Sequence, residues 1–538
     1  MTEAGTAAQG TGRPVNKSAA LATVCMAIWV IALNTTAINT AVGAIADDLD
    51  LSTSVLSWSV NAYVLAAAAF VVIGGQIGDV VGRRNAFLIG IAVFAVGSGL
   101  VAGAQSGPML IGGRTFQGLG SAVMMPSTMS IISDVFPPEE RGTALGVWGA
   151  VGGLGFAIGP LYGGFFSDEL SWRGIFLGDF VWLGLGAVMT LTALRNLPRA
   201  TKGTKFDKLG APFLVIGLFS LVLGIQQAGT WGWTSPAILG SLFLAVALLG
   251  IFWVIEHRVA HPMIHFELFR LGRFTAGNVT TFVNAMGLFG ILYFFNLWAQ
   301  APVLLDESAI GASLLLIPFG VAMFVFSFLG GRIADRIGFA IPLTLGFLSM
   351  AAGFALMATV SESTSASDLW PAMTLGGIGV GVTFSTSSAA GMVAVPDKSA
   401  GEASGVINMF RYLGGVFIIA VGTLLYVGLG TAALNESIDA AGVSEQSDDT
   451  LDHALTASAE DFETIEQEQD TKTREAFEAG AAQGITDGFK ATSILTGAAG
   501  LVGAVVSAIL LRKRAPVARR VRAESREEVF GLADPDSP

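Results

Sequence analysis

The sequence predicts an all-α polytopic membrane protein with two six-helix halves, two inserted helices and both termini in the cytoplasm. Three observations support this fold class. Of the 538 residues, 52% are hydrophobic and only 13% are charged, whereas an ordinary soluble domain carries about 25% charged residues. Fourteen apolar stretches follow one another along the chain, each about as long as a membrane-spanning helix. A short motif after the second stretch returns after the tenth, which indicates two related halves.

The apolar stretches define the expected helices. A helix needs about 20 apolar residues to cross the hydrocarbon core of a bilayer. The first stretch is longer than the core of a signal peptide, about 7–15 residues, so we interpret it as an uncleaved transmembrane helix. The expected spans are 18–43, 55–77, 86–105, 109–133, 142–166, 174–195, 209–228, 236–256, 274–299, 309–333, 341–360, 369–394, 403–427 and 491–511.

Lysine and arginine gather in every second connection between these spans. With a cytoplasmic N-terminus, 16 of the 29 basic residues fall in cytoplasmic segments before residue 400, and seven more fall in the tail 512–538. Basic loops stay on the cytoplasmic side, and the even number of spans returns the C-terminus to that side. We therefore expect cytoplasmic tails at 1–17 and 512–538 and a multi-pass protein of the plasma membrane.

The net charge of −12 comes from one expected extracellular loop. Residues 428–490 contain 15 acidic and 3 basic residues, so the rest of the chain is close to neutral. The centre of this segment is rich in Ala, Glu and Gln, which is compatible with a surface helix, a helical hairpin or a solvated disordered loop.

The repeated motif reads Gly-x-Ile-small-Asp-x-x-Gly. Its copies run from Gly75 to Gly82 and from Gly331 to Gly338. If each half has six spans, the seventh and eighth spans form an insert between the halves. The expected division is an N-terminal half at 18–200, two linker helices at 201–260 and a C-terminal half at 261–511.

Further motifs lie in the spans of the N-terminal half. The first copy continues to Arg84, Arg114 to Gly120 reads RTFQGLG, and Gly155 to Gly164 reads GFAIGPLYGG. With these motifs the chain resembles the major facilitator superfamily, in its fourteen-helix drug:proton antiporter branch. The resemblance implies a multidrug-type exporter of amphipathic or lipophilic small molecules that is coupled to protons.

Charged residues cluster at the expected cytoplasmic ends of the spans. Opposite charges on Asp79, Arg83 and Asp134 would hold the two halves together and separate as the transporter changes conformation. The alternative is a solvated turn whose basic residues only follow the positive-inside rule. The expected gate comprises Gly75, Asp79, Gly82, Arg83, Arg84, Asp134, Gly331, Asp335 and Gly338.

Few charged residues lie inside the spans. Arg114 would cost about 2.5–3.5 kcal/mol at a helix centre, so it either faces a cavity or extends to the interface. Gln117 lies on the same helix face. Asp179 is a further candidate for the cavity unless it lies at the outer interface. Arg411 is another unless it lies near the inner interface. The expected transport and coupling residues are Asn34, Asn39, Arg114, Gln117, Asp179 and Arg411.

The fifth span carries small residues every four positions. Gly155, Gly159 and Gly163 have the spacing that lets membrane helices pack closely, and Pro160 weakens the helix between them. With Gly164, these residues form the expected antiporter motif, in which a closely packed bend controls which side of the protein is sealed.

Proton coupling is the point at which the chain departs from the family it resembles. Its antiporters typically carry an aspartate in the first helix, where this chain has Asn34. An amide forms hydrogen bonds but does not release a proton in the physiological range. We therefore expect Asp179, opposite Arg114, to carry any proton coupling.

Other function classes lack sequence support. We find no phosphate-binding loop and no nucleophile–base motif, so we expect no ATP, no cofactor, no nucleic-acid partner and no enzyme. Three histidines spaced by four, His257, His261 and His265, are interrupted by Pro262 and do not predict a metal site. The expected partners are a small-molecule substrate, lipid and protons, and the expected state is a monomer. Two alternatives stay open: a dedicated exporter of one endogenous metabolite or lipid, and a non-transporting membrane sensor.

Overall fold

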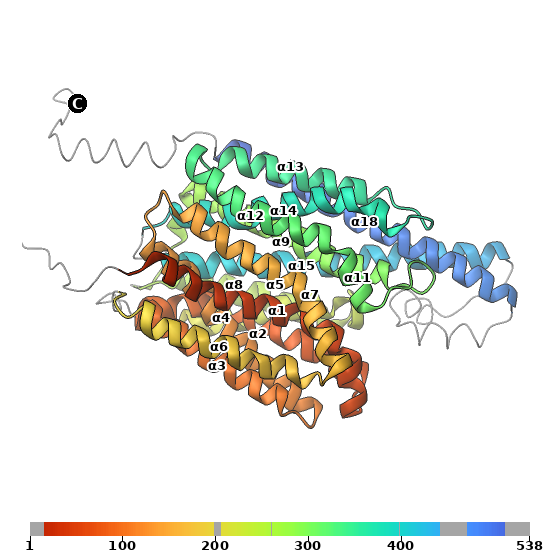
Figure 1. Ribbon diagram of the computed structural model, residues 1–538, viewed down its shortest axis with the longest axis horizontal. Coiled ribbons are helices and arrows are strands. Elements are labelled where there is room, and N and C mark those ends of the chain that lie inside the picture. The colour runs from red at the N-terminus through yellow and green to blue at the C-terminus, as the bar shows by residue number, and fades with distance from the viewer. Residues whose placement is uncertain (1–14, 198–205, 260, 397–398, 442–470, 512–538) are drawn as a thin grey trace, which may run out of the picture.

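The computed structural model describes residues 15–197, 206–259, 261–396, 399–441 and 471–511 (Figure 1). These residues form helices and connecting loops, with no strand among them. The expected tails, 1–17 for the most part and 512–538 entirely, lie outside the described residues. The first six helices are α1 (Lys17–Leu49), α2 (Thr53–Val81), α3 (Arg83–Ala102), α4 (Gly107–Val135), α5 (Arg141–Glu169) and α6 (Arg173–Ala193).

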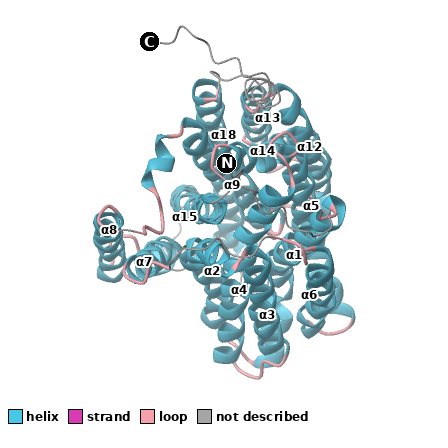
Figure 2. Cartoon of the chain, turned by 90° about the vertical axis from the view of Figure 1, so that its left-hand side faces the viewer, coloured by secondary structure: helices cyan, strands magenta, loops and turns pink. Residues whose placement is uncertain are grey.

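Two further helices lie at the edge of the bundle. The helices α7 (Gly210–Trp231) and α8 (Pro236–Glu256) pack against each other, and α7 also contacts α2 and α15 (Ala400–Ala441). Figure 2 shows this pair beside the main body, with α8 outermost. Both helices fall within the segment 201–260 that was expected to contain two linker helices.

The α-helices after α8 begin with α9 (Gly272–Gly290). This helix continues through a π-helical turn (Ile291–Phe295) into α10 (Asn296–Ala299). Two short 3-10 helices, Phe266–Arg270 and Ala366–Leu369, precede α9 and α14. The other helices are α11 (Ala309–Leu315), α12 (Ile317–Ile337), α13 (Ala340–Met357), α14 (Trp370–Val393) and α18 (Thr471–Leu510).

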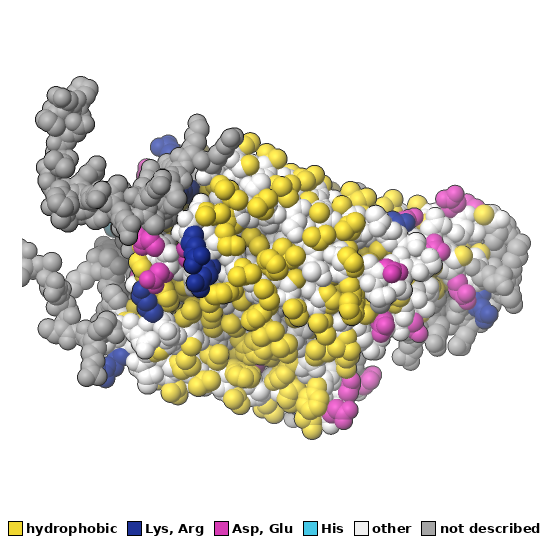
Figure 3. Space-filling model, turned by 45° about the horizontal axis from the view of Figure 1, so that its top comes forward, with side chains coloured by type: hydrophobic (Ala, Val, Ile, Leu, Met, Phe, Trp, Pro, Cys, Tyr) yellow, Lys and Arg dark blue, Asp and Glu magenta, His cyan; other side chains and the backbone are white. Residues whose placement is uncertain are grey.

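The surface of the bundle is that of a membrane protein. Twelve helices of the described residues are long and apolar enough to cross a bilayer. Figure 3 shows a broad hydrophobic band on one face, with the charged side chains gathered toward the two ends. The helices α4 and α14 are not among the twelve, although they contain 29 and 24 residues. Most residues of both are buried against neighbouring helices, so lipid does not require them to be apolar all round.

The two ends of the acidic segment 428–490 are helical. Instead of stopping near 427, α15 continues to Ala441, and α18 begins at Thr471 rather than near 491. Leu434 and Ile438 of α15 pack against Phe477 and Ala481 of α18. We call this pair of helix ends the arm; it projects from one end of the molecule in Figure 1. The centre of the segment, 442–470, lies outside the described residues.

The helices α1–α6 and the helices from α9 onward, called the two halves below, meet along two contacts. The helix α5 packs against α12 and α14, while α15 packs against α2 and α4. The helices α2 and α12 each end at a motif glycine with positive φ, 90° at Gly82 and 89° at Gly338. Such φ values are accessible to glycine but rarely to other residues, so both copies of the motif end their helix in the same way.

Candidate functional site

The first copy of the motif joins α2 to the start of α15. A Cβ atom on Gly75 would lie 2.3 Å from the carbonyl oxygen of Gly401, so only glycine allows this approach. One turn later, the Asp79 carboxylate accepts hydrogen bonds from the backbone N–H groups of Gly401 at 3.2 Å and Glu402 at 3.0 Å. The first N–H groups of a helix have no partner within the helix, and its dipole favours a negative charge there. Asp79 therefore caps α15.

The second copy joins α12 to the start of α5 in the same way. A Cβ atom on Gly331 would lie 2.1 Å from the carbonyl oxygen of Gly142. The Asp335 carboxylate accepts hydrogen bonds from the N–H groups of Gly142 at 2.8 Å and Thr143 at 2.6 Å, and from the Thr143 hydroxyl at 2.6 Å. In each copy, the motif aspartate of one half thus caps a helix of the other half.

The partners of the gate differ from those expected. Arg83 forms an ion pair with Asp134, but both residues belong to the first six helices, so this pair does not join the halves. Arg83 also lies 3.9 Å from Asp79 and orients that cap. The motif aspartates therefore join the halves through backbone N–H groups rather than through opposite charges. Arg84, beside Arg83, is half-buried at the start of α3.

Removing one cap should open this end of the protein. We expect Asp335→Ala to raise the open population about 2- to 30-fold, because a lost helix cap costs about 0.5–2 kcal/mol. Ser404 of α15 is buried against α4, where its hydroxyl lies 3.0 Å from that of Ser130. A cysteine in its place would react with a thiol reagent only when the halves separate. The only native cysteine, Cys25, is buried. Maleimide labelling of Ser404→Cys should accelerate with Asp335→Ala and not with the exposed control Glu362→Ala; equal rates would contradict the role of the cap.

Glu402 connects the cap on Asp79 to the segment after α8. Its carboxylate accepts hydrogen bonds from the His265 backbone N–H at 2.5 Å and from His265 Nδ1 at 2.9 Å. The hydrogen bond to Glu402 raises the pKa of His265 above its usual range, with smaller contributions from the charges of Glu256 and Glu267. Because the folded-state pKa is raised, the charged contact is fully present at low pH and is lost as the pH rises through that value.

This contact predicts that the same end of the protein loosens at higher pH. The labelling rate of Ser404→Cys should rise between about pH 6 and pH 8 by more than the intrinsic change in thiol reactivity. Comparing His265→Gln with the parent at each pH removes the intrinsic change, since both carry the same thiol. We expect the variant to label faster at low pH only. The exposed His261→Gln is the control, and a constant ratio for His265→Gln would contradict this prediction.

A second polar group lies inside the first six helices. Asp179 of α6 is fully buried, and its Oδ1 accepts a hydrogen bond from Asn34 Nδ2 of α1 at 2.6 Å. Its Oδ2 accepts hydrogen bonds from Ser98 Oγ of α3 at 2.7 Å and from Gln117 Nε2 of α4 at 3.4 Å. Four helices therefore converge on one carboxylate, which lies in the interior rather than at the outer interface.

Arg114 joins this group through Gln117. Its Nη1 donates a hydrogen bond to Gln117 Oε1 at 2.8 Å, so the amide of Gln117 lies between the guanidinium and Asp179. The guanidinium is 1% exposed and lies 4.6 Å from the centre of the Tyr63 ring, a cation–π contact that partly offsets the cost of burial. Arg114 therefore faces the interior of the bundle instead of extending to the interface.

The structure brings together four of the six expected transport residues. Asn39 is exposed on α1 and lies away from this group, and Arg411 lies on α15 beside the Phe384 ring. Two participants were missed by sequence reasoning, Ser98 and Tyr63. Ser98 is an isolated polar residue in an apolar stretch, Tyr63 follows Asn61 near the start of another, and no motif marks either.

The glycines of α5 lie against neighbouring helices. A Cβ atom on Gly159 would lie 1.9 Å from Thr36 Oγ1, and one on Gly163 would lie 2.3 Å from a carbonyl oxygen of α1. Gly155 also faces α1, whereas Gly164 faces α11. These distances leave no room for a side chain at Gly159 or Gly163, so α5 and α1 are held at backbone contact.

Pro160 lies inside α5, on the part of the helix that faces α1. Proline has no N–H, so the carbonyl group of Phe156 lacks its helical donor. The Thr36 hydroxyl lies 3.3 Å from this oxygen and equally far from the Ala32 oxygen of its own helix, so it can donate to either. The Thr40 hydroxyl lies 3.3 Å from the Pro160 oxygen and 3.0 Å from the Ala37 oxygen. Two threonines of α1 are therefore placed to stabilise the interrupted helix and tie it to α1.

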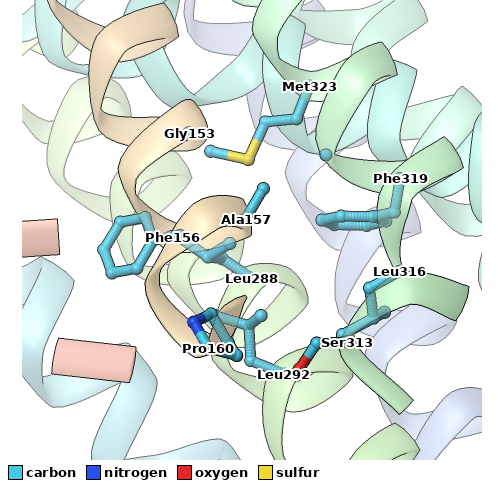
Figure 4. Close-up of a pocket in the computed structure, with 11 residues that line it drawn as sticks. Gly153, Phe156, Ala157, Pro160, Leu288, Leu292, Ser313, Leu316, Phe319 and Met323 are labelled. Atoms are coloured by element: carbon cyan, nitrogen blue, oxygen red, sulfur yellow. The ribbon is translucent and has the colours of Figure 1, made fainter. Parts of the chain in front are cut away.

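Next to Pro160 lies a small apolar pocket between the two halves (Figure 4). Its free volume is about 20 Å³, room for about one water molecule, and Ser313 supplies the polar side chain of its lining. A drug-sized ligand needs about 300–1,000 Å³, so the pocket must widen before it can hold one. The lining residues are Gly153, Phe156, Ala157 and Pro160 of α5 together with Leu288, Leu292, Ser313, Leu316, Phe319, Gly320 and Met323.

Comparison with known families decides the assignment. The family model described as "Major Facilitator Superfamily" matches residues 24–419, more than half of the chain. The chain belongs to the major facilitator superfamily. This confirms the resemblance inferred from the motifs, and it makes the protein a multi-pass integral membrane protein.

Several relatives in this superfamily are named for drug transport. The chain is 30% identical over 415 residues to the multidrug transporter protein MdtP of Bacillus subtilis, covering 76% of this chain and 75% of the relative. It is also 30% identical over 404 residues to the tetracenomycin C resistance and export protein of Streptomyces glaucescens, covering 74% of each chain.

Solved structures of the superfamily share the fold. The human organic anion transporter MFSD10 superposes with a TM-score of 0.56, covering 91% of this chain and 98% of that protein. The proton:xylose symporter XylE superposes with a TM-score of 0.55, covering 91% and 94%. Both are 14% identical to this chain, so the likeness concerns the fold alone.

Proposed function

We propose that this protein is a secondary exporter of amphipathic or lipophilic small molecules in the plasma membrane, driven by protons that move inward. The observation that carries the proposal is the pair of carboxylate caps that joins the two halves around a small apolar pocket. The apolar lining suits lipophilic ligands, and release of the caps would widen the space between the halves. The printed names of the relatives, multidrug transport and antibiotic export, point to the same substrate class.

The proposal includes fourteen spans, with α4 and α14 as the two most polar of them. In this arrangement both termini are cytoplasmic, and the caps on α5 and α15 close the cytoplasmic side. The first six helices then move against the last six, and α7, which contacts α2 of the first group and α15 of the last, must shift against one of them. Breaking two caps exposes the pocket to the cytoplasm, and re-forming them seals the pocket behind the substrate.

Proton coupling in this proposal runs through Asp179. Ionisable residues buried in membrane spans commonly serve proton relays, and Asn34 has no proton to exchange. A proton on Asp179 turns an acceptor of hydrogen bonds into a donor, so Ser98 and Gln117 must rearrange. Because the Gln117 amide also accepts a hydrogen bond from Arg114, its rearrangement would alter the position of the Arg114 side chain. On the same helix, Ser121 lies 3.2 Å from the hydroxyl of Tyr412 on α15, which links α4 to the other half.

The test uses the full-length protein. In a host that lacks its own exporters, expression should lower the accumulation of several chemically distinct lipophilic dyes. In proteoliposomes, their transport should accelerate when a pH gradient is imposed and should need no ATP. Transport of one compound from a broad panel would favour the dedicated exporter. No transport of any compound, with the protein folded and inserted, would favour the sensor and reject the proposal.

A further inference from the structure

We propose that Arg411 forms a binding subsite for a negatively charged group of the substrate, so that amphipathic organic anions, carboxylates above all, are among the exported molecules. The inference rests on the proposed export function and specifies its substrate class. Three observations support it: the contacts of Arg411, the balance of charges in the interior, and the position of Arg411 between the two halves.

The guanidinium of Arg411 is buried with most of its hydrogen-bonding capacity unused. The side chain belongs to a residue that is 4% exposed and lies eleven residues after Ala400, about 16 Å along α15. Its Nη2 donates a hydrogen bond to Ser388 Oγ at 2.7 Å, while Nε and Nη1 have no hydrogen-bond partner in the structure. A buried charged group that lacks partners is costly, and such groups in membrane spans commonly mark substrate pathways.

The positive charges of the buried Arg114 and Arg411 are balanced differently. Arg114 shares a hydrogen-bonded network with the carboxylate of Asp179, so that network holds one cation and one carboxylate. None of the ion pairs found among the described residues includes Arg411. Its main contacts are aromatic: the centre of the guanidinium lies 4.2 Å from the Phe384 ring and 6.0 Å from the Trp148 ring. The interior therefore carries a positive charge that a ligand can neutralise.

The position of Arg411 makes it accessible when the halves separate. Trp148 belongs to α5 and Phe384 to α14, and their rings stack with centres 5.8 Å apart across the contact between the halves. Trp148 lies about one turn before Gly153, which lines the pocket, and on the side toward the cap at Gly142. Release of that cap draws α5 away from α14, parts the two rings and uncovers the free N–H groups along the path to the pocket.

The chemistry of this subsite selects its ligand. Nitrogen donors of a guanidinium match the oxygen atoms of a carboxylate, and this pairing is strong where water is excluded. Phe384 and Trp148 offer flat apolar faces to the body of the same molecule. A ligand with an aromatic or alkyl body and one carboxylate satisfies both features, whereas its neutral ester satisfies only the second.

The experiment compares an amphipathic aromatic carboxylate with its methyl ester on the full-length protein. Binding to the detergent-solubilised parent is measured by calorimetry, and transport is measured in proteoliposomes. We expect the parent to bind the acid about ten- to a hundredfold more tightly than the ester, the range for a hydrogen bond to a charged group. Arg411→Gln should raise KM for the acid by a similar factor and leave KM for the ester unchanged, while Arg411→Lys should restore part of the preference.

The outcomes separate this inference from the proposed function. Equal binding of acid and ester to the parent overturns the subsite, whatever the variants do. An unchanged acid-to-ester ratio in a folded Arg411→Gln protein overturns it as well. Tight binding of the acid without transport of either compound would instead contradict the export function and support the subsite. If Arg411→Gln does not fold, the comparison of the two ligands on the parent decides alone.

Discussion

Replacing Asp179 with asparagine is expected to abolish the dependence of export on the proton gradient while leaving the protein folded in the membrane. The amide has the shape of the protonated acid. It can accept the hydrogen bond that Asn34 Nδ2 now donates to Asp179 Oδ1 at 2.6 Å, and it can donate toward Ser98. It has no proton to release, so the step that links transport to the gradient is lost. Uphill export should fall to the level of liposomes without protein.

Two measurements separate coupling from binding. Substrate counterflow, which exchanges labelled for unlabelled substrate without a gradient, should persist in Asp179→Asn. The double variant Asn34→Asp with Asp179→Asn exchanges the two side chains of one hydrogen-bonded pair and should recover part of the gradient dependence. Asp168→Asn, an exposed position at the end of α5, is the control and should behave as the parent. If Asp179→Asn responds to the gradient as the parent does, Asp179 is not the proton carrier.

Gly159→Leu is expected to abolish export altogether, including counterflow. A Cβ atom at this position would lie 1.9 Å from Thr36 Oγ1 and 2.9 Å from the Leu33 carbonyl oxygen, so any side chain forces α5 away from α1. Overpacking of a tight contact typically costs about 1–3 kcal/mol. The displacement would also take the Thr36 hydroxyl out of reach of the Phe156 oxygen, which Pro160 leaves without a helical donor.

The matched control is a leucine at a glycine that has free space. Gly184 lies on the exposed face of α6, and a Cβ atom there would meet nothing within 4 Å. We expect Gly184→Leu to transport as the parent does, with the same yield of folded protein. Normal counterflow by Gly159→Leu would mean that the contact between α5 and α1 tolerates expansion, and the role assigned to this motif would be wrong.

Much of the fold follows from local sequence signals. The apolar stretches, the repeated motif and the insert at α7 and α8 were accessible because membrane spans and repeats are properties of contiguous sequence. The helical arm was only one of three open alternatives. Leu434 and Ile438 are spaced by four, as are Phe477 and Ala481, and these two pairs are the apolar signal that indicates packed helices rather than a solvated loop.

The candidate site was less predictable, because its contacts join residues far apart in the chain. The motif glycines indicated a close approach of backbones, but no sequence feature identifies Gly401 or Gly142 as the groups approached. Charge pairing favoured an ion pair across the halves, whereas unpaired N–H groups at a helix start attract a carboxylate equally well. Likewise, Asp179 and Arg114 were expected to face each other, and only the structure puts the Gln117 amide between them.

The arm also bears on how the motion of this protein can be observed. The helix α15 contains 42 residues, so it is about 63 Å long, and the Asp79 cap holds its first turn. The arm forms the other end of this helix. If α15 moves as one rigid helix when the proposed caps break, the arm moves with it at a site far from the caps. A fluorophore or an antibody fragment attached there would follow each transport cycle without touching the substrate path.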